Sequence, residues 1–181
     1  HDGCNARAWV QLKVNADIGP IPKGTSLFTR IPDQPVLLPN DHLILGQAQA
    51  GFETMHTVEK LFKAHNELHF YTWGNQRCCL PKGATCATLD GHYPDLKKGH
   101  VLILEEVLGP QTGQPEEADP SHRHAVRLTK VSQPLTDPLD GHYITDVEWG
   151  VEDALPFPLC ISTRTDHEHG ERYIELSLIH I

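Results

Sequence analysis

Cysteine is the residue type whose spacing most directly suggests chemistry, because Cys78, Cys79 and Cys86 lie within nine positions. Such a group could bind a metal, carry out redox chemistry or lead into a β-strand. Structural zinc sites usually use two close pairs of ligands, whereas adjacent side chains of an extended chain point to opposite faces. Cys86 has no fourth ligand after it at a useful spacing, and Cys4 and Cys160 are isolated. We therefore expect free thiols in a chain made in the cytoplasm, with Cys86 on a strand and the adjacent pair before a turn.

The chain has 13 histidines, and four of them have a spacing that could serve a metal. His122 and His124 are separated by one residue, so they face the same way on a strand, and His167 and His169 repeat this spacing. A metal-dependent hydrolase could use both pairs if the fold brought them together. Neither pair has a carboxylate or cysteine at ligand spacing, which favours solvated histidines beside a loop and in a polar tail. We assign no metal ligand and no cofactor.

Two pairs of acidic residues, Glu105-Glu106 and Glu116-Glu117, are the candidates for a glycosidase dyad. Adjacent residues on a strand point apart, so neither pair forms a dyad by itself. The chain also lacks the G-x-S-x-G, G-x-G-x-x-G and P-loop patterns of hydrolases and nucleotide-binding proteins. We expect no enzyme and assign no catalytic residue.

The tryptophans Trp9, Trp73 and Trp149 could stack against a sugar or a base. Tryptophan at the end of a strand more often belongs to the core or to a subunit contact. The sequence leaves both interpretations open.

The elements that must position these residues are short strands separated by Gly and Pro. Alternation of apolar residues at 8–16 predicts a half-buried strand. Further strands are predicted over 25–30, 52–58, 66–73, around Cys86, and over 100–107, 122–132, 142–150 and 157–163. The only helices expected are short, over Asp41–Ala50 and as a turn at Val151–Leu155. This pattern predicts an all-β fold with mainly antiparallel strands.

The pattern of a Lys-Gly pair followed by a predicted strand occurs three times in the chain. "IPKGTSLFT" at 21–29 echoes "LPKGATCATL" at 80–89, and "LKKGHVLILEE" at 96–106 repeats the Lys-Gly step. Proline fixes φ and glycine permits positive φ, so Pro-Lys-Gly predicts a tight turn. We expect two small β subdomains, 1–64 and 65–163, with a long hairpin loop at 108–121 and a polar tail at 164–175.

The net charge of −9 argues against a nucleic-acid or anionic-membrane surface. No apolar run approaches the ~20 residues of a membrane span. The chain begins at His1 and has Met55 as its single methionine, so we expect a fragment of a longer protein. The terminal LSLIHI, Leu176–Ile181, is encoded by CTGTCTCTTATACACATC, the end of a transposon adapter. We expect adapter read-through that has no function and is dispensable for stability, and the alternative is an ordinary Leu/Ile strand.

Four long strings carry a resemblance to a known family: "HDGCNARAWVQLKV", "HFYTWGNQRCCLPKGAT", "GHVLILEEVLGPQTGQPEEADPSHRHAVRLTKV" and "VEWGVEDALPFPLC". Together they resemble the baseplate assembly proteins of contractile phage tails and phage-tail-like injection systems, which are related to J-type baseplate wedge proteins. The resemblance runs from His1 to about Ile161 and fades after Thr163. Cys4 departs from it, since a small polar residue is expected there.

The resemblance implies a non-enzymatic structural component of the baseplate wedge, taken from the middle of a longer chain. It implies other wedge and hub proteins as partners, multimeric assembly, synthesis in the bacterial cytoplasm and incorporation into a virion or tail-like particle. The alternative is a β-rich carbohydrate- or surface-binding module of a tail, which would use Trp73 and nearby polar residues. We expect the loop at 108–121 to be an assembly contact, with a solvated mobile loop as the alternative.

Overall fold

The computed structural model describes residues 6–29, 50–133 and 135–181, and the chain is nearly all β, with 37% strand and 6% helical residues. The predicted all-β fold is therefore confirmed. The strands are β1 (Ser26–Phe28), β2 (Gly51–Glu53), β3 (His69–Phe70), β4 (Cys78–Leu80), β5 (Cys86–Asp90), β6 (Val101–Glu106), β7 (Arg123–Val131), β8 (Leu135–Thr136), β9 (Tyr143–Trp149), β10 (Leu159–Arg164), β11 (Tyr173–Glu175) and β12 (Ser177–His180). The described residues also contain three short 3-10 helices: η1 (Lys63–His65), η2 (Pro115–Glu117) and η3 (Val151–Asp153).

The chain divides into two compact units, of which the smaller is Val14–Lys63. Its centre is the antiparallel pair of β1 and β2, extended by isolated bridges from Ile18 to Leu61 and from Ile21 to Val58. The helix expected over Asp41–Ala50 falls on residues 41–49 outside the described part, and Ala50 is not helical.

The larger unit contains Ala64–Ile181 and also takes residues up to Lys13. The strand expected at 8–16 is wrong: residues 6–14 form no regular secondary structure, and Trp9 and Val10 are 59% and 50% exposed. Alternating apolar residues form a strand only where another strand accepts their backbone hydrogen bonds, and no strand pairs with this segment in the described part of the chain.

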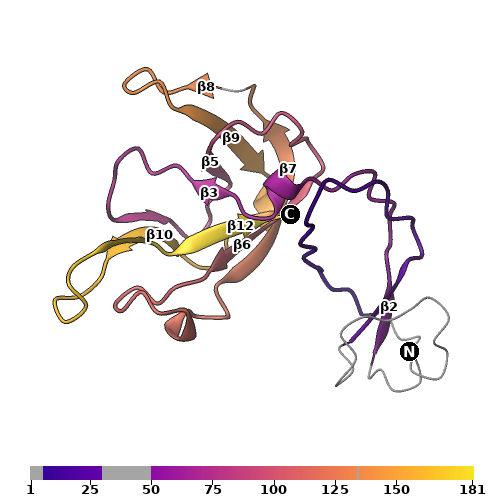
Figure 1. Cartoon of the computed structure of the whole chain (residues 1–181), viewed down its shortest axis with the longest axis horizontal. Coiled ribbons are helices and arrows are strands. Elements are labelled where there is room, and N and C mark those ends of the chain that lie inside the picture. Colours follow the sequence, from indigo (N-terminus) through magenta and orange to yellow (C-terminus); the bar gives the residue numbers. More distant parts are fainter. Residues whose placement is uncertain (1–5, 30–49, 134) are drawn as a thin grey trace. The chain divides into compact units, whose positions relative to one another are not determined.

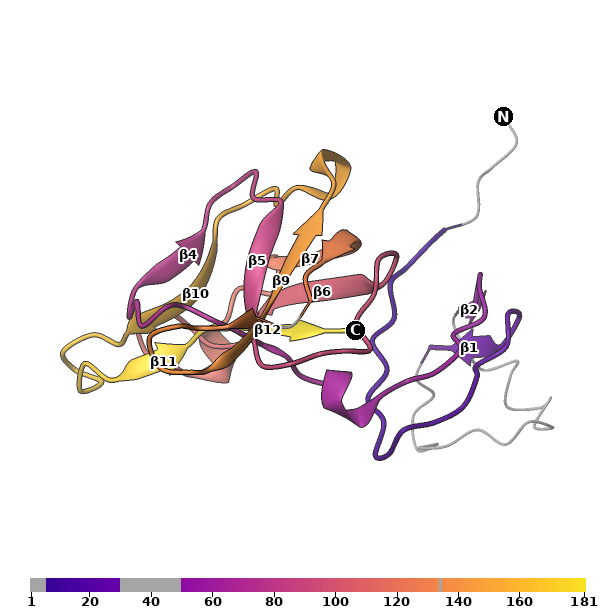
Figure 2. The same ribbon diagram turned by 90° about the horizontal axis from the view of Figure 1, so that it is seen from above.

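The main sheet has the antiparallel order β12-β6-β7-β9-β5-β3, and β8 pairs with β9 beside this path (Figure 1). Its two ends meet at Leu68 and Ile179, whose backbone groups exchange hydrogen bonds of 2.8 and 3.0 Å. The sheet therefore closes on itself. A second sheet has the order β11-β10-β4 and leaves β4 and β11 as its edges (Figure 2).

The core lies inside the closed sheet and is formed by the apolar residues that alternate along its strands. Leu89, Leu102, Leu104, Val126, Leu128 and Val147 are each at most 1% exposed. Leu155 and Leu159, which follow η3, fill the same cluster. Burial of these side chains on one face explains why the strands hold their register.

The C-terminal residues belong to the fold, in contrast to the expected polar tail and dispensable end. In the segment 164–175, Thr165 is 3% exposed and β11 pairs with β10. β12 then pairs with β6 over four positions, and both Leu176 and Ile179 are fully buried. The expectation that Leu176–Ile181 has no structural role is therefore wrong, because this segment supplies the strand that closes the main sheet.

The Lys-Gly turns form as predicted. Gly24, Gly83 and Gly99 have φ values of +83°, +86° and +91°, which side chains other than glycine rarely adopt. Each glycine lies in a turn that leads into a strand: β1, β5 or β6. The strand expected over 66–73 is shorter than predicted, since only His69 and Phe70 pair as β3.

Candidate functional site

The histidine pairs do not form a common site. His122 contacts the carboxylate of Glu106 through Nδ1 at 2.7 Å, whereas His124 lies 3.1 Å from the backbone oxygen of Asp153. His169 pairs with Asp166, next to it on the β10–β11 hairpin. Within residues 6–29, 50–133 and 135–181, no group of three or more His, Cys, Asp or Glu side chains is arranged to hold a metal ion.

The cysteines differ from their expected state. Cys79 on β4 and Cys160 on β10 are directly opposite each other and form a disulfide, so the expectation of free thiols is wrong for these two. They are 81 positions apart in the sequence, and only the pairing of β4 with β10 brings them together. Cys78 and Cys86 are free thiols, and Cys86 lies on β5 as predicted. Burial raises the pKa of the Cys78 thiol.

The two pairs of glutamates also have separate environments. Glu105 forms an ion pair of 2.8 Å with Arg123, while the neighbouring Glu106 is 7% exposed and turns to the other face of β6. Glu117 in η2 accepts a hydrogen bond of 2.8 Å from the hydroxyl of Thr112. Neither pair of neighbours places its two carboxylates around a common space.

The tryptophans have two different roles in the fold. Trp149 is 3% exposed, and its indole N–H donates to the backbone oxygen of Ala84 at 3.1 Å, so it belongs to the core. Trp73 is 55% exposed and has a positive φ of 55°, which is unusual for a residue other than glycine. Its ring contacts Tyr71 edge to face, with 5.1 Å between ring centres.

The loop between β6 and β7 is held by hydrogen bonds both at its base and within its interior. The two strands pair from Val101 opposite Arg127 to Glu105 opposite Arg123, which confirms the predicted hairpin. At the base of the loop, the buried carboxylate of Glu106 accepts hydrogen bonds from the backbone N–H of Asp119 at 2.9 Å and from His122. A buried carboxylate needs such partners, and here they fix both ends of the loop.

The interior of this loop is also tightly organised. The N–H of Gly109 donates to the oxygen of Gln114, and the N–H of Gly113 donates to the oxygen of Gly109, both at 2.9 Å. A side chain at Gly109 would place its Cβ 2.6 Å from the Cβ of Glu117, so glycine is needed for this close approach. Hydrogen bonds from Ser121 lower the pKa of the Asp119 carboxyl. These hydrogen bonds give the segment a defined backbone path between β6 and β7.

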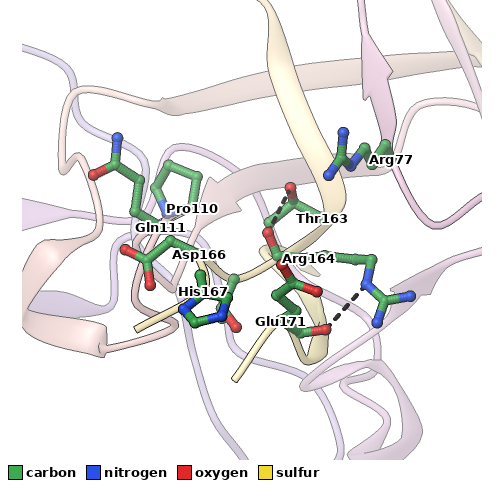
Figure 3. Close-up of a pocket in the computed structure, with 9 residues that line it drawn as sticks. Arg77, Pro110, Gln111, Thr163, Arg164, Asp166, His167 and Glu171 are labelled. Atoms are coloured by element: carbon green, nitrogen blue, oxygen red, sulfur yellow. Dashed lines mark hydrogen bonds between the residues drawn. The ribbon is translucent and has the colours of Figure 1, made fainter. Parts of the chain in front are cut away.

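The loop also contacts the β10–β11 hairpin. The N–H of Asp166 donates to the oxygen of Gln111 at 2.9 Å, and Ile174 lies 3.3 Å from the position a Cβ on Gly113 would take. An open pocket of about 490 Å³ lies between the two hairpins (Figure 3).

Polar side chains dominate this pocket. Figure 3 shows Arg77 and the guanidinium of Arg164 at one side of the pocket and Gln111 at the other. The guanidinium of Arg164 donates to the backbone oxygen of Glu171 at 3.0 Å and to the side-chain oxygen of Gln76 at 3.1 Å. An open pocket of this kind suits polar side chains of another protein better than an enclosed substrate. We call this pocket and the loop 108–121 the loop surface.

Sequence reasoning selected the loop but missed the residue that fixes it. In the sequence, Glu106 is a candidate only as an acid next to Glu105, and the motif search gives no reason to choose between these two neighbours. The signal that could have found it is a glutamate inside a nearly continuous apolar strand, since such a residue is rarely buried without a partner.

Comparison with models of protein families, with curated proteins and with solved structures gives no match for this chain. Among the residues that the structure describes, no helix has the length and apolar character needed to cross a membrane.

Proposed function

We propose that this chain is part of a structural component of the baseplate wedge of a contractile phage tail or phage-tail-like injection system. In this role it acts through contacts with other wedge and hub proteins, within a multimeric particle that assembles after synthesis in the bacterial cytoplasm. The four sequence strings that resemble baseplate assembly proteins support the identity of the particle. The organised loop surface supports the mode of action.

The observation that carries the proposal is the way in which Glu106 fixes the loop. A loop of polar residues that is only a connection between two strands does not require a buried carboxylate at its base. Here the carboxylate holds the N–H of Asp119, and internal hydrogen bonds fix the residues between. The polar side chains of Gln111, Gln114 and Glu116 remain exposed. A preorganised polar surface lowers the entropy lost on association, which favours docking.

The experiment replaces Gln111–Asp119 with a Gly-Ser linker in the full-length parent protein and measures the yield of sheathed particles. We expect the yield to fall while the protein still folds, because the strands β6 and β7 remain. A matched control replaces the exposed turn residues Pro81 and Lys82 with Gly-Ser, since this turn belongs neither to the loop surface nor to any other contact proposed here. If the linker variant yields as many contractile particles as the control, the loop surface is not an assembly contact.

A further inference from the structure

A second surface, separate from the loop surface, gathers aromatic rings and carboxylates at one place. We call it the Trp73 platform; it consists of Tyr71, Trp73, Asp90, Asp137, Asp140 and His142. These residues come from the segment after β3, the end of β5 and the β8–β9 hairpin. We infer that the Trp73 platform binds a cationic segment of a partner protein, through arginine or lysine side chains. This inference depends on the chemistry of the platform and does not require the proposed baseplate function.

The aromatic part of the platform is fixed before any partner arrives. The rings of Tyr71 and His142 are stacked, with centres 5.5 Å apart and an angle of 8° between their planes. Trp73 packs edge to face on Tyr71 and remains 55% exposed. An exposed tryptophan face attracts cations, because the ring quadrupole places negative potential above the plane.

The charge of the platform has the sign that a cation needs. Asp137 accepts a hydrogen bond of 2.7 Å from the hydroxyl of Tyr71, and Asp90 pairs with His142. Asp140 lies close enough to act electrostatically on both rings. Three carboxylates therefore face one imidazole. The net charge of the whole chain, −9, adds to this negative field and favours a basic partner.

The hydrogen-bonding groups of the platform distinguish a cation from a sugar. Asp137 uses one oxygen for Tyr71 and the other for the N–H of Leu139, at 2.8 Å. The side chain of Asp140 accepts a hydrogen bond of 2.9 Å from the backbone N–H of His142. A sugar is recognised through free donors and acceptors around the ring that it stacks on. Here both oxygens of Asp137 and one oxygen of Asp140 are already bonded within the chain, which leaves fewer acceptors for a sugar, whereas the ring face and the negative charge remain available.

The test uses four blocked hexapeptides in which glycine alternates with arginine, lysine, glutamine or glutamate, and one neutral oligosaccharide, cellotetraose. Binding is followed by the indole N–H resonances of the tryptophans in a ¹H–¹⁵N NMR spectrum. The resonance of the buried Trp149 reports on folding. We expect the arginine and lysine peptides to shift the Trp73 resonance, with binding that weakens as salt increases. The glutamine and glutamate peptides should not shift it.

Two variants and one control test whether residues of the Trp73 platform bind the arginine peptide. Binding to the variants is followed by the backbone amide resonance of His142 in the same spectrum, because Trp73→Ala has no Trp73 resonance. Trp73→Ala should weaken binding of the arginine peptide about two- to five-fold, the effect of an exposed cation–π contact. Asp140→Asn, which keeps the hydrogen bond to His142 but removes the charge, should weaken it also. Trp9→Ala is the control, since Trp9 is 59% exposed but lies outside the platform. The inference is overturned if the neutral peptide binds equally well, if no peptide binds, or if cellotetraose alone shifts Trp73; the last result would identify a carbohydrate site.

Discussion

Replacing Glu106 by alanine tests directly whether the loop surface is held from inside. Glu106 is 7% exposed and accepts one hydrogen bond from the N–H of Asp119 and one from His122. Glu106→Ala removes both bonds and leaves the two donors without their partner.

The expected magnitude follows from these contacts. A hydrogen bond to a charged group contributes about 1.5–3 kcal/mol to the free energy of unfolding. The side chain of His122 is 30% exposed, so water replaces part of its bond. We therefore expect Glu106→Ala to lower the free energy of unfolding by about 2–4 kcal/mol. Glu106→Gln keeps the shape and one acceptor, and should lower it by about 1 kcal/mol or less.

The assay combines urea unfolding with hydrogen exchange of the Asp119 amide. In Glu106→Ala this amide should exchange much faster than in the original chain, because its acceptor is gone. Glu148→Ala is the matched control: Glu148 lies on β9, pairs with Lys130 at the surface and does not contact the loop. The control should leave the Asp119 amide protected and change stability by about 0–1 kcal/mol. The reasoning is refuted if Glu106→Ala changes stability no more than the control does, or if the Asp119 amide stays protected.

Three further predictions concern other parts of the larger unit. Ile179→Ala should lower the free energy of unfolding by about 2–5 kcal/mol in urea unfolding, because a fully buried side chain of the closing strand is removed; an unchanged midpoint would contradict the closed sheet. The pKa of His142 is raised above its usual 6.5, first by the hydrogen bond with Asp90 and then by the negative charge of Asp90. The pair of His142 and Asp90 therefore contributes its full stabilisation at pH values below the pKa of His142 in the unfolded chain. This stabilisation is lost as the pH rises through the pKa of His142 in the folded chain. NMR titration should give a midpoint above 6.5 that falls in Asp90→Asn. Thiol titration of the unfolded, unreduced protein should count two thiols fewer than after reduction, owing to the disulfide of Cys79 with Cys160; equal counts would show that the disulfide does not form.

Local patterns in the sequence predicted the features that depend on neighbouring residues. The Lys-Gly steps at Gly24, Gly83 and Gly99 predicted turns with positive φ, because only glycine adopts that backbone conformation without strain. The apolar runs predicted β6 and β7 as a hairpin, since continuous or alternating apolar residues between turn signals are typical of strands. Short segments of this kind were enough to determine the all-β class.

Features that depend on distant residues were decided by the tertiary structure alone. The alternation at 8–16 is as regular as that of a true strand, yet it forms none in the absence of a pairing partner. Cys79 and Cys160 form a disulfide only because β4 lies beside β10. Glu106 fixes the loop because Asp119 and His122, which follow it by 13 and 16 positions, fold back to contact its carboxylate. Sequence periodicity specifies which face of a strand is apolar, but pairing between strands is non-local, and it determines which polar groups meet.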